Sequence, residues 1–167
     1  MLWDGITHPR WTIGTFLRAI VLDGMPHFEN IDAGRGAPIV SSKAIRDTSG
    51  RSGHTWETFR DIRRLWKGTL VIKGLLDPRD ARLAVEAGAD GIIVSTHGGR
   101  QVDGVLPALS ALPAIVEAAG ATPVMIDSGF RHGSDVIKAL ALGAKFVFVG
   151  RPFNYAAGIG GEEGARL

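Results

Sequence analysis

TLVIKGLLDPRDARLAVEAGADGIIVS, residues 69–95, is the stretch of sequence that decides the fold class of this chain. A short apolar run ends at Lys73, and a second apolar run follows Gly88. Between them, Asp77 and Pro78 stand where the N-cap and the first residue of a helix are expected. Unbroken apolar strands on both sides of an amphipathic helix are typical of a parallel sheet covered by helices. The stretch therefore predicts a strand, a helix and a second, parallel strand.

The same alternation of strand and helix continues toward the C-terminus. We expect strands over 69–74, 91–95, 123–127 and 146–150, and helices over 55–66, 77–88, 107–120 and 134–143. AVEAGADGIIVS (84–95) and ALALGAKFVFVG (139–150) repeat one unit of helix, glycine and buried strand. Such units build either a (β/α)8 barrel, which takes about 250 residues when complete, or an open doubly wound sheet. Four strands in 167 residues therefore predict part of a larger α/β fold.

The first third of the chain is less regular. Apolar residues at helical spacing predict a helix over about 10–22, which ends at Gly24. Residues 24–53 show no sustained period and are rich in Gly, Ser and Asp, which predicts a long loop. We therefore divide the chain into residues 1–54, a helix and variable loop, and residues 55–167, the repeating part, whose first helix has Thr55 as its N-cap.

Composition and charge narrow the possible functions. The 19 basic residues are interspersed with 17 acidic ones, so nucleic-acid binding has no support. The chain has no cysteine, which excludes disulfides and thiolate metal sites. His8, His27, His54 and His132 lack the spacing of metal ligands, and we expect no metal site. No apolar run approaches the roughly 20 residues of a membrane span, so we expect a soluble chain.

Polar and charged residues follow the C-terminal end of every predicted strand. They are Lys73 at the end of the first strand, and the residues that end or follow the others: Ser95 to Arg100 for the second, Asp127 to Arg131 for the third, and Gly150 and Arg151 for the fourth. Parallel α/β folds assemble their sites at this edge of the sheet. We therefore predict one site built from all four strand ends.

The residues HGGR, 97–100, predict a catalytic loop within this site. A histidine taken alone is more often a surface or hydrogen-bonded side chain than a base, and Lys73 taken alone could lie in solvent. Gly98 and Gly99 allow a ligand to come close, and Arg100 offers two hydrogen bonds to a carboxylate. The combination favours a base beside a bound carboxylate.

The residues DSGFRHGSD, 127–135, allow two interpretations. They could form an ordinary turn into a helix capped by Ser134. Alternatively, N–H groups around Gly129 and the guanidinium of Arg131 could bind a phosphate together with the pair at 150–151. We favour the phosphate site, because the two halves come from adjacent strands, where barrels commonly bind phosphate.

Two segments, VIKGLLDPRDARLAVEAGADGIIVSTHGGRQVDG (71–104) and IDSGFRHGSDVIKALALGAKFVFVGRPFNYA (126–156), resemble the FMN-dependent α-hydroxy-acid dehydrogenases and oxidases. This family includes L-lactate dehydrogenase, mandelate dehydrogenase and glycolate oxidase, and the resemblance is dense over about 55–157. It implies that the chain is the C-terminal half, about strands five to eight, of a (β/α)8 TIM barrel. The family's first half carries active-site tyrosines and the aspartate that orients the base, and this chain does not include that half.

The resemblance also implies a role for each residue at the strand ends. His97 would be the base that takes a substrate proton, Arg100 would bind the substrate carboxylate, and Lys73 would stabilise the reduced flavin near N1 and O2. Ser95 would contact the flavin. The remaining cofactor-binding residues would be Asp127, Ser128, Gly129, Arg131, Gly150 and Arg151. Thr96 replaces the family's usual asparagine and Val102 its usual leucine, so we expect altered loop geometry.

The implied reaction is the FMN-dependent oxidation of a small, lactate-like L-2-hydroxy acid to the 2-keto acid. The complete enzyme would be a homo-oligomer, with oxygen, a quinone or a cytochrome as the open choice of electron acceptor. We expect a cytoplasmic protein, with peripheral attachment to the inner membrane as the alternative. Two other functions stay open: a different phosphate- or FMN-binding TIM-barrel enzyme, and a non-catalytic chain. The last would self-associate or bind a partner, since a half barrel exposes two sheet edges and an apolar face.

Overall fold

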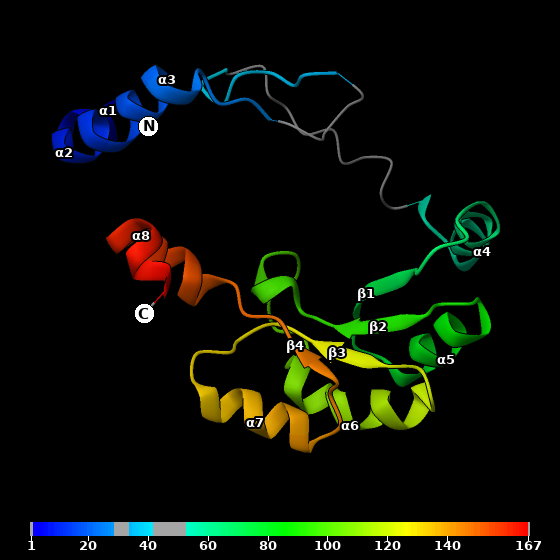
Figure 1. Ribbon diagram of the computed structural model, residues 1–167. Coiled ribbons are helices and arrows are strands. Elements are labelled where there is room, and N and C mark those ends of the chain that lie inside the picture. The colour runs from blue at the N-terminus through cyan, green and yellow to red at the C-terminus, as the bar shows by residue number, and fades with distance from the viewer. Residues whose placement is uncertain (1, 29–33, 42–52, 167) are drawn as a thin grey trace. The chain divides into compact units, whose positions relative to one another are not determined.

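A computed structural model describes residues 2–28, 34–41 and 53–166, and nothing is described for the side chains of Leu2 and Asp4. Contacts within the chain divide it into two compact units, Met1–Ser52 and Gly53–Leu167 (Figure 1). None of the helices in the described ranges is long and apolar enough to cross a membrane. The second unit holds all of the predicted strand ends.

The first unit is helical over most of its described length. Its elements are α1 (Leu2–Thr7), α2 (Pro9–Trp11), the π-helix η1 (Thr12–Leu17) and α3 (Arg18–Asp23). The helix predicted over 10–22 is therefore too short at its start, and its π-helical turn has a period that a 3.6-residue pattern does not reveal. Gly24 ends the helix with φ 82°, as predicted.

The described part of the predicted loop, 24–28 and 34–41, contains no helix. Its one regular contact is an isolated antiparallel bridge between His27 and Pro38. The ring Nδ1 of His27 also lies 2.7 Å from the carbonyl oxygen of Gly36. The rest of the predicted loop, 29–33 and 42–52, lies outside the described residues.

Four strands of the second unit form one parallel sheet in the order β1-β2-β3-β4. They are β1 (Val71–Leu75), β2 (Gly91–Val94), β3 (Val124–Ile126) and β4 (Phe146–Val147). The predicted alternation of strand and helix is confirmed, although β4 has two residues where five were expected. The register places Lys73 opposite Ile93, Ile93 opposite Met125, and Met125 opposite Phe146. Because side chains alternate along a strand, these residues share one face of the sheet.

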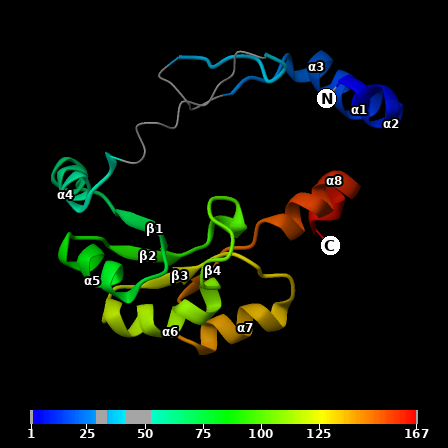
Figure 2. The ribbon, with the colours of Figure 1, turned by 180° about the vertical axis from the view of Figure 1, so that it is seen from behind.

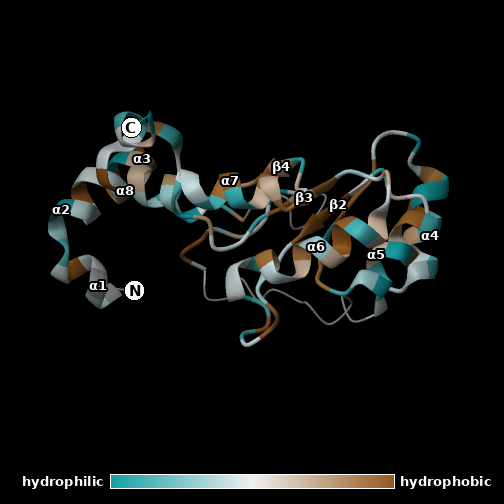
Figure 3. Ribbon diagram, turned by 90° about the horizontal axis from the view of Figure 1, so that it is seen from below, coloured by the Kyte–Doolittle hydropathy of each residue, from teal (hydrophilic) through white to brown (hydrophobic). Residues whose placement is uncertain are grey.

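Helices cover the other face, where the core lies. The views from the front and from behind both place α5 (Pro78–Glu86), α6 (Ala108–Ala119) and α7 (Gly133–Ala141) on the same side of the sheet (Figures 1 and 2). The largest buried side chains are Ile92, Val94, Ile126, Leu112 and Ile115. In Figure 3 the strands are mostly brown, whereas the helices mix brown with teal, as expected for elements with one solvated side. The uncovered face exposes Phe146 by 55% and Phe148 by 41%.

Side-chain caps that the sequence predicts are found at the starts of two helices of the second unit. Helix α4 (Trp56–Leu65) starts after Thr55, whose hydroxyl accepts a hydrogen bond from the N–H of Thr58, and α5 starts after Asp77 and Pro78. Both predicted caps are confirmed. Ser134 does not cap α7, as the less favoured interpretation of 127–135 would have it: α7 begins at Gly133, and the carboxylate of Asp135 accepts from the N–H groups of Arg131 and His132. A carboxylate at the third helical position that reaches back to the N–H of the N-cap residue is the contact of the N3 residue in a capping box.

The final helix, α8 (Arg151–Arg166), was not predicted from the sequence. The segment contains Gly158, Gly160, Gly161 and Gly164, and glycine is among the weakest helix formers. The helix is kinked at Gly161, where φ is 59°, and none of its described residues is buried. Its first residue, Arg151, contacts the candidate site through its guanidinium.

Candidate functional site

Side chains from three adjacent strand ends meet at the C-terminal edge of the sheet. The ammonium of Lys73 donates to the hydroxyl oxygen of Ser95 over 2.9 Å and lies 3.1 Å from a carboxylate oxygen of Asp127. Parallel strands in register bring these positions together although the sequence separates them. Ser95 is 1% exposed, so its hydroxyl is a fixed, buried part of the cluster.

Asp127 is held in its charged form by its neighbours. Its burial alone would raise the pKa of the carboxyl group. Hydrogen bonds from the hydroxyls of Ser95 and Ser128, together with the ammonium of Lys73, outweigh burial and hold the pKa of Asp127 below its ordinary value. At neutral pH the cluster therefore contains an ionised pair of Lys73 and Asp127 at the end of the sheet.

Residues 96–100, which we call the histidine loop, follow β2 directly. The loop contains the short 3-10 turn His97–Gly99. His97 has φ 53°, Gly98 φ 68° and Gly99 φ 74°, a run of left-handed backbone. Two glycines adopt this conformation without strain, whereas a histidine adopts it at a cost that its surroundings must offset.

The histidine ring packs against β1. A Cβ atom placed on Gly74, which has φ 105°, would lie 2.7 Å from Cε1 of His97. Only a residue without a side chain leaves room for the ring there. Gly74 is a site residue that was not predicted from the sequence, where its one signal is its position directly after Lys73 at the end of an apolar run.

An arginine at the start of α8 also reaches the histidine loop. A guanidinium nitrogen of Arg151 donates to the carbonyl oxygen of Gly98 over 3.0 Å. A Cβ atom on Gly98 would lie 2.8 Å from this guanidinium. The glycine therefore serves the loop twice, through its left-handed backbone and through the close approach of Arg151.

Hydrogen bonds and an ion pair join one group of the predicted site residues and leave a second group outside it. The joined residues are Lys73, Ser95, His97, Asp127, Ser128 and Arg151. The second group has four members. Arg100 is joined to the cluster only through its backbone, where its N–H donates to the carbonyl oxygen of His97 over 3.4 Å. Gly129, Arg131 and Gly150 lie at the same strand ends without a hydrogen bond or ion pair to this cluster in the part of the chain that the structure describes.

The residues of the second group provide positive charge and open space at the C-terminal edge of the sheet. Arg131 donates to the carbonyl oxygen of its neighbour Phe130, and its side chain is exposed. A Cβ atom on Gly129 or Gly150 would meet nothing within 4 Å. The guanidinium of Arg100 has no side-chain partner among the described residues. Two arginines and two glycines thus offer hydrogen-bond donors to a ligand.

A parallel sheet whose helices cover one face, with charged groups gathered at its C-terminal edge, defines part of a barrel-type α/β enzyme. The family model of FMN-dependent dehydrogenases matches residues 1–167, and the chain belongs to that family. The chain is similar to an L-lactate dehydrogenase of Xanthomonas euvesicatoria pv. vesicatoria, with 47% identity over 96% of this chain and 41% of that protein. An L-lactate dehydrogenase of Pseudomonas entomophila is 43% identical over 99% of this chain and 43% of its own length.

Solved structures of the same family agree with this assignment. A soluble mutant of the membrane-associated (S)-mandelate dehydrogenase from Pseudomonas putida matches with a TM-score of 0.65 and 46% identity, over 68% of this chain and 32% of that chain. A mandelate oxidase mutant with a monooxide FMN adduct matches with a TM-score of 0.64 and 48% identity, over 68% of this chain and 36% of that chain. The predicted family and the predicted partial barrel are confirmed. The chain spans less than half the length of the relatives it matches.

Proposed function

We propose that this chain supplies the cofactor- and substrate-binding strand ends of an FMN-dependent enzyme that oxidises a small L-2-hydroxy acid to its 2-keto acid. The observation that carries the proposal is the cluster of Lys73, Ser95 and Asp127 beside the histidine loop. Its position at the C-terminal edge of a partial barrel supports it, as does the 47% identity to an L-lactate dehydrogenase.

The strand ends fit an anionic cofactor. Lys73, Arg131 and Arg151 stand at the ends of three different strands, and a Cβ atom on Gly129 or Gly150 would meet nothing within 4 Å, which leaves space beside the backbone there. Arginine and exposed N–H groups are the donors that bind phosphate oxygens. The proposal assigns the phosphate of FMN to the donors at 129–131 and 150–151.

The other cofactor contacts follow from the buried cluster. Asp127 is an ionised acceptor suited to the hydroxyls of a ribityl chain, and Ser95 is its buried neighbour. Lys73 offers a positive charge that stabilises negative charge on a ring system placed beside it. When bound, FMN supplies a flavin ring that accepts two electrons from the substrate.

The substrate would be held between the histidine loop and the open side of the sheet. Arg100 has no side-chain partner among the described residues and offers two parallel hydrogen bonds to a carboxylate. His97 would take a proton from the substrate, with its ring placed by the absence of a side chain at Gly74. A base and a carboxylate clamp three positions apart in the chain suit a 2-hydroxy acid, whose carboxylate adjoins the reacting carbon.

A chimera tests the proposal. Residues 1–167 replace the matching segment of the Xanthomonas euvesicatoria L-lactate dehydrogenase, and gel filtration with circular dichroism verifies that the product folds. We expect the chimera to retain FMN and to lose its visible flavin absorbance when L-lactate, glycolate or (S)-mandelate is added without oxygen. A folded chimera without FMN would contradict the cofactor assignment.

Two outcomes would favour the other functions considered above. Reduction of the flavin by a phosphorylated substrate and by none of the three hydroxy acids would indicate a different FMN-binding barrel enzyme. Bound FMN that no substrate reduces, in a chimera whose other half is active in its parent, would indicate a non-catalytic chain. Arg64→Ala, a change of an exposed residue on α4, is the matched control for handling and folding.

The assembly and location of the protein belong to the same proposal. We propose a homo-oligomer in the complete enzyme, and a cytoplasmic location with peripheral attachment to the inner membrane as the alternative. The membrane-associated (S)-mandelate dehydrogenase named above supports the alternative. Sedimentation of the chimera and fractionation of cells that produce it, with and without a salt wash, test both statements.

A further inference from the structure

The hydroxyl group of Ser128 is fully occupied by the protein itself. It donates to a carboxylate oxygen of Asp127 over 2.7 Å. It accepts the N–H of Thr96 over 3.1 Å and the N–H of Gly98 over 3.2 Å. A serine hydroxyl has one proton to donate and two lone pairs that accept. All three are therefore used, and none is left for a bound cofactor.

Ser95 makes a parallel set of contacts from the neighbouring strand. Its hydroxyl oxygen accepts from the N–H of His97 over 3.0 Å and from the ammonium of Lys73 over 2.9 Å. It is also one of the groups whose hydrogen bond lowers the pKa of Asp127. Two serine hydroxyls thus accept three consecutive N–H groups of the histidine loop, and that of Ser128 is itself bound to the carboxylate of Asp127.

These N–H groups need such partners because the loop cannot pair them internally. Left-handed backbone at residues 97–99 turns the chain out of both helix and sheet geometry. Buried or half-buried N–H groups that lose their partner destabilise the conformation that exposes them. Ser128 is itself left-handed, with φ 80°, which turns its side chain off the end of β3 toward the loop. The loop and β3 are 30 residues apart in sequence at the closest of these contacts.

We propose that Ser128 is a positioning residue that fixes the histidine loop against the end of β3, instead of a ligand of the cofactor. The role of the loop in the reaction rests on the function proposed above, whereas the attachment of the loop does not. Ser128 acts through Thr96 and Gly98, the residues on either side of His97, so it sets where the histidine ring lies. The carboxylate of Asp127 holds the Ser128 hydroxyl in the orientation that presents its lone pairs to the loop.

Amide hydrogen exchange of the full chain tests the attachment. Ser128→Gly removes the hydroxyl and relieves the left-handed backbone, and Ser128→Ala removes the hydroxyl alone. We expect the N–H groups of Thr96 and Gly98 to exchange about tenfold faster in both variants, because each loses its acceptor. Ser134→Ala, an exposed serine on α7, is the matched control and should leave both rates unchanged. Unchanged exchange in both Ser128 variants would overturn the proposal.

Flavin kinetics in the chimera test the consequence for the reaction. In Ser128→Gly we expect flavin reduction at saturating L-lactate to slow about tenfold, since a displaced base loses orientation. The Kd for FMN should stay within about twofold of the parent value, because no cofactor contact is lost. A weakened FMN Kd with an unchanged reduction rate would identify Ser128 as a cofactor ligand and overturn the proposal. A parent chimera that no hydroxy acid reduces would instead contradict the proposed function, while the exchange experiment would still decide the role of Ser128.

Discussion

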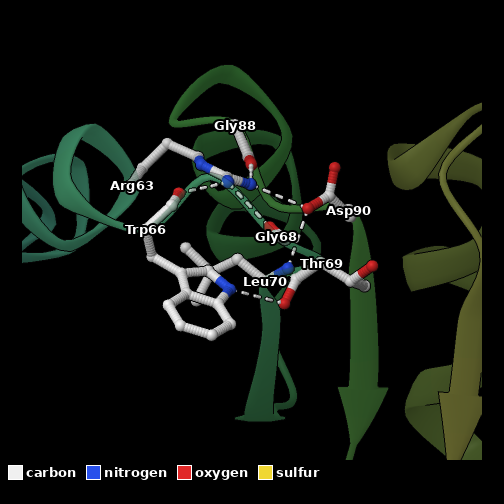
Figure 4. Close-up of polar contacts among 7 residues, drawn as sticks. All are labelled: Arg63, Trp66, Gly68, Thr69, Leu70, Gly88 and Asp90. Atoms are coloured by element: carbon white, nitrogen blue, oxygen red, sulfur yellow. Dashed lines mark hydrogen bonds and ion pairs between the residues drawn. The ribbon is translucent and has the colours of Figure 1, made fainter.

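The two ends of the parallel sheet use charged side chains in different ways. At the N-terminal end, the guanidinium of Arg63 donates to Asp90 over 2.7 Å, to the carbonyl oxygen of Gly68 over 2.8 Å and to that of Gly88 over 3.3 Å (Figure 4). It also donates to the carbonyl oxygen of Trp66. The same oxygen of Asp90 accepts the N–H of Leu70, where β1 is about to begin. Every partner in this cluster belongs to the protein.

At the C-terminal end the charged groups are only partly used. Lys73 and Asp127 pair with each other, yet the side chain of Lys73 is 41% exposed. The guanidinium of Arg131 contacts a single carbonyl oxygen, and that of Arg151 contacts another. Hydrogen-bond donors that have no partner among the described residues at this end are available to a ligand.

The two clusters differ in the partners of their hydrogen-bond donors. The N-terminal cluster is structural, and the C-terminal cluster is the candidate functional one. An arginine that binds several backbone carbonyls ties elements together and has little left for a ligand. In parallel α/β barrels the N-terminal end of the strands serves stability and the C-terminal end carries the active site. Changes at the two ends should accordingly separate stability from activity.

The largest effect is expected from His97→Gln in the chimera. Removal of a general base slows the step that it assists by about 10²–10⁴-fold, so L-lactate should reduce the flavin far more slowly. FMN should stay bound, since the histidine is assigned to the substrate. Anaerobic stopped-flow absorbance measures the rate. His132→Gln, a change of an exposed histidine at the start of α7, is the control, and an unaltered rate in His97→Gln would remove the histidine from its role.

Gly74→Ala should disturb the same end of the sheet through packing. The new Cβ would lie 2.7 Å from the histidine ring, and we expect flavin reduction to slow about 10²-fold as the ring moves. Gly120→Ala also places an alanine at a positive φ, 58°, with nothing within 4 Å of its Cβ. Both variants should therefore lose stability in urea unfolding, whereas only Gly74→Ala should lose activity. Equal activity in the two would show that the ring is not confined there.

Arg63→Ala, at the N-terminal end of the sheet, should lower stability without lowering activity. It removes the donors that join the end of α4 to the starts of β1 and β2, and we expect the free energy of unfolding to fall by about 2 kcal/mol. FMN affinity and flavin reduction in the chimera should not change. Arg64→Ala removes one exposed ion pair with Asp61 and should cost less than about 0.5 kcal/mol. A loss of FMN affinity in folded Arg63→Ala would erase the distinction between the two ends.

The smallest effect concerns acid sensitivity at the N-terminal end. The N–H of Leu70 and the guanidinium of Arg63 hold the pKa of Asp90 below the ordinary aspartate value of 3.8. A lowered pKa in the folded state means that the charged carboxylate stabilises the fold above the unfolded-state pKa. This contribution is lost as pH falls through the folded-state pKa.

Asp90→Asn tests this predicted pH dependence of stability. The variant should be less stable than the parent chain at neutral pH, and the difference in urea midpoint should shrink once the pH falls below about 3.8. Asp61→Asn, which removes a carboxylate from the exposed pair with Arg64, is the matched control. A difference that stays constant from neutral to strongly acidic pH would contradict the assignment.

The elements of the second unit were predictable because their signals are local. Thr55 and Asp77 cap their helices with side chains that reach two or three residues along the chain. Apolar runs marked the strands, since strands buried in a parallel sheet have no polar face. The start of α7 and the whole of α8 were not predicted. Helix α7 begins at Gly133, one residue before the predicted start, and the four glycines of α8 argue against a helix because glycine is a weak helix former.

By itself, the sequence determined the alternation of strand and helix, the family, and the gathering of Lys73, His97 and Asp127 at one edge of a sheet. These follow from periodicity and from the rule that parallel strands end on the same side. Only the tertiary structure decided which of these groups touch. Arg151 reaches a carbonyl 53 residues away, and Ser128 holds an N–H 32 residues away. Such contacts depend on strand register and on left-handed backbone at single residues, which no local pattern of side chains specifies.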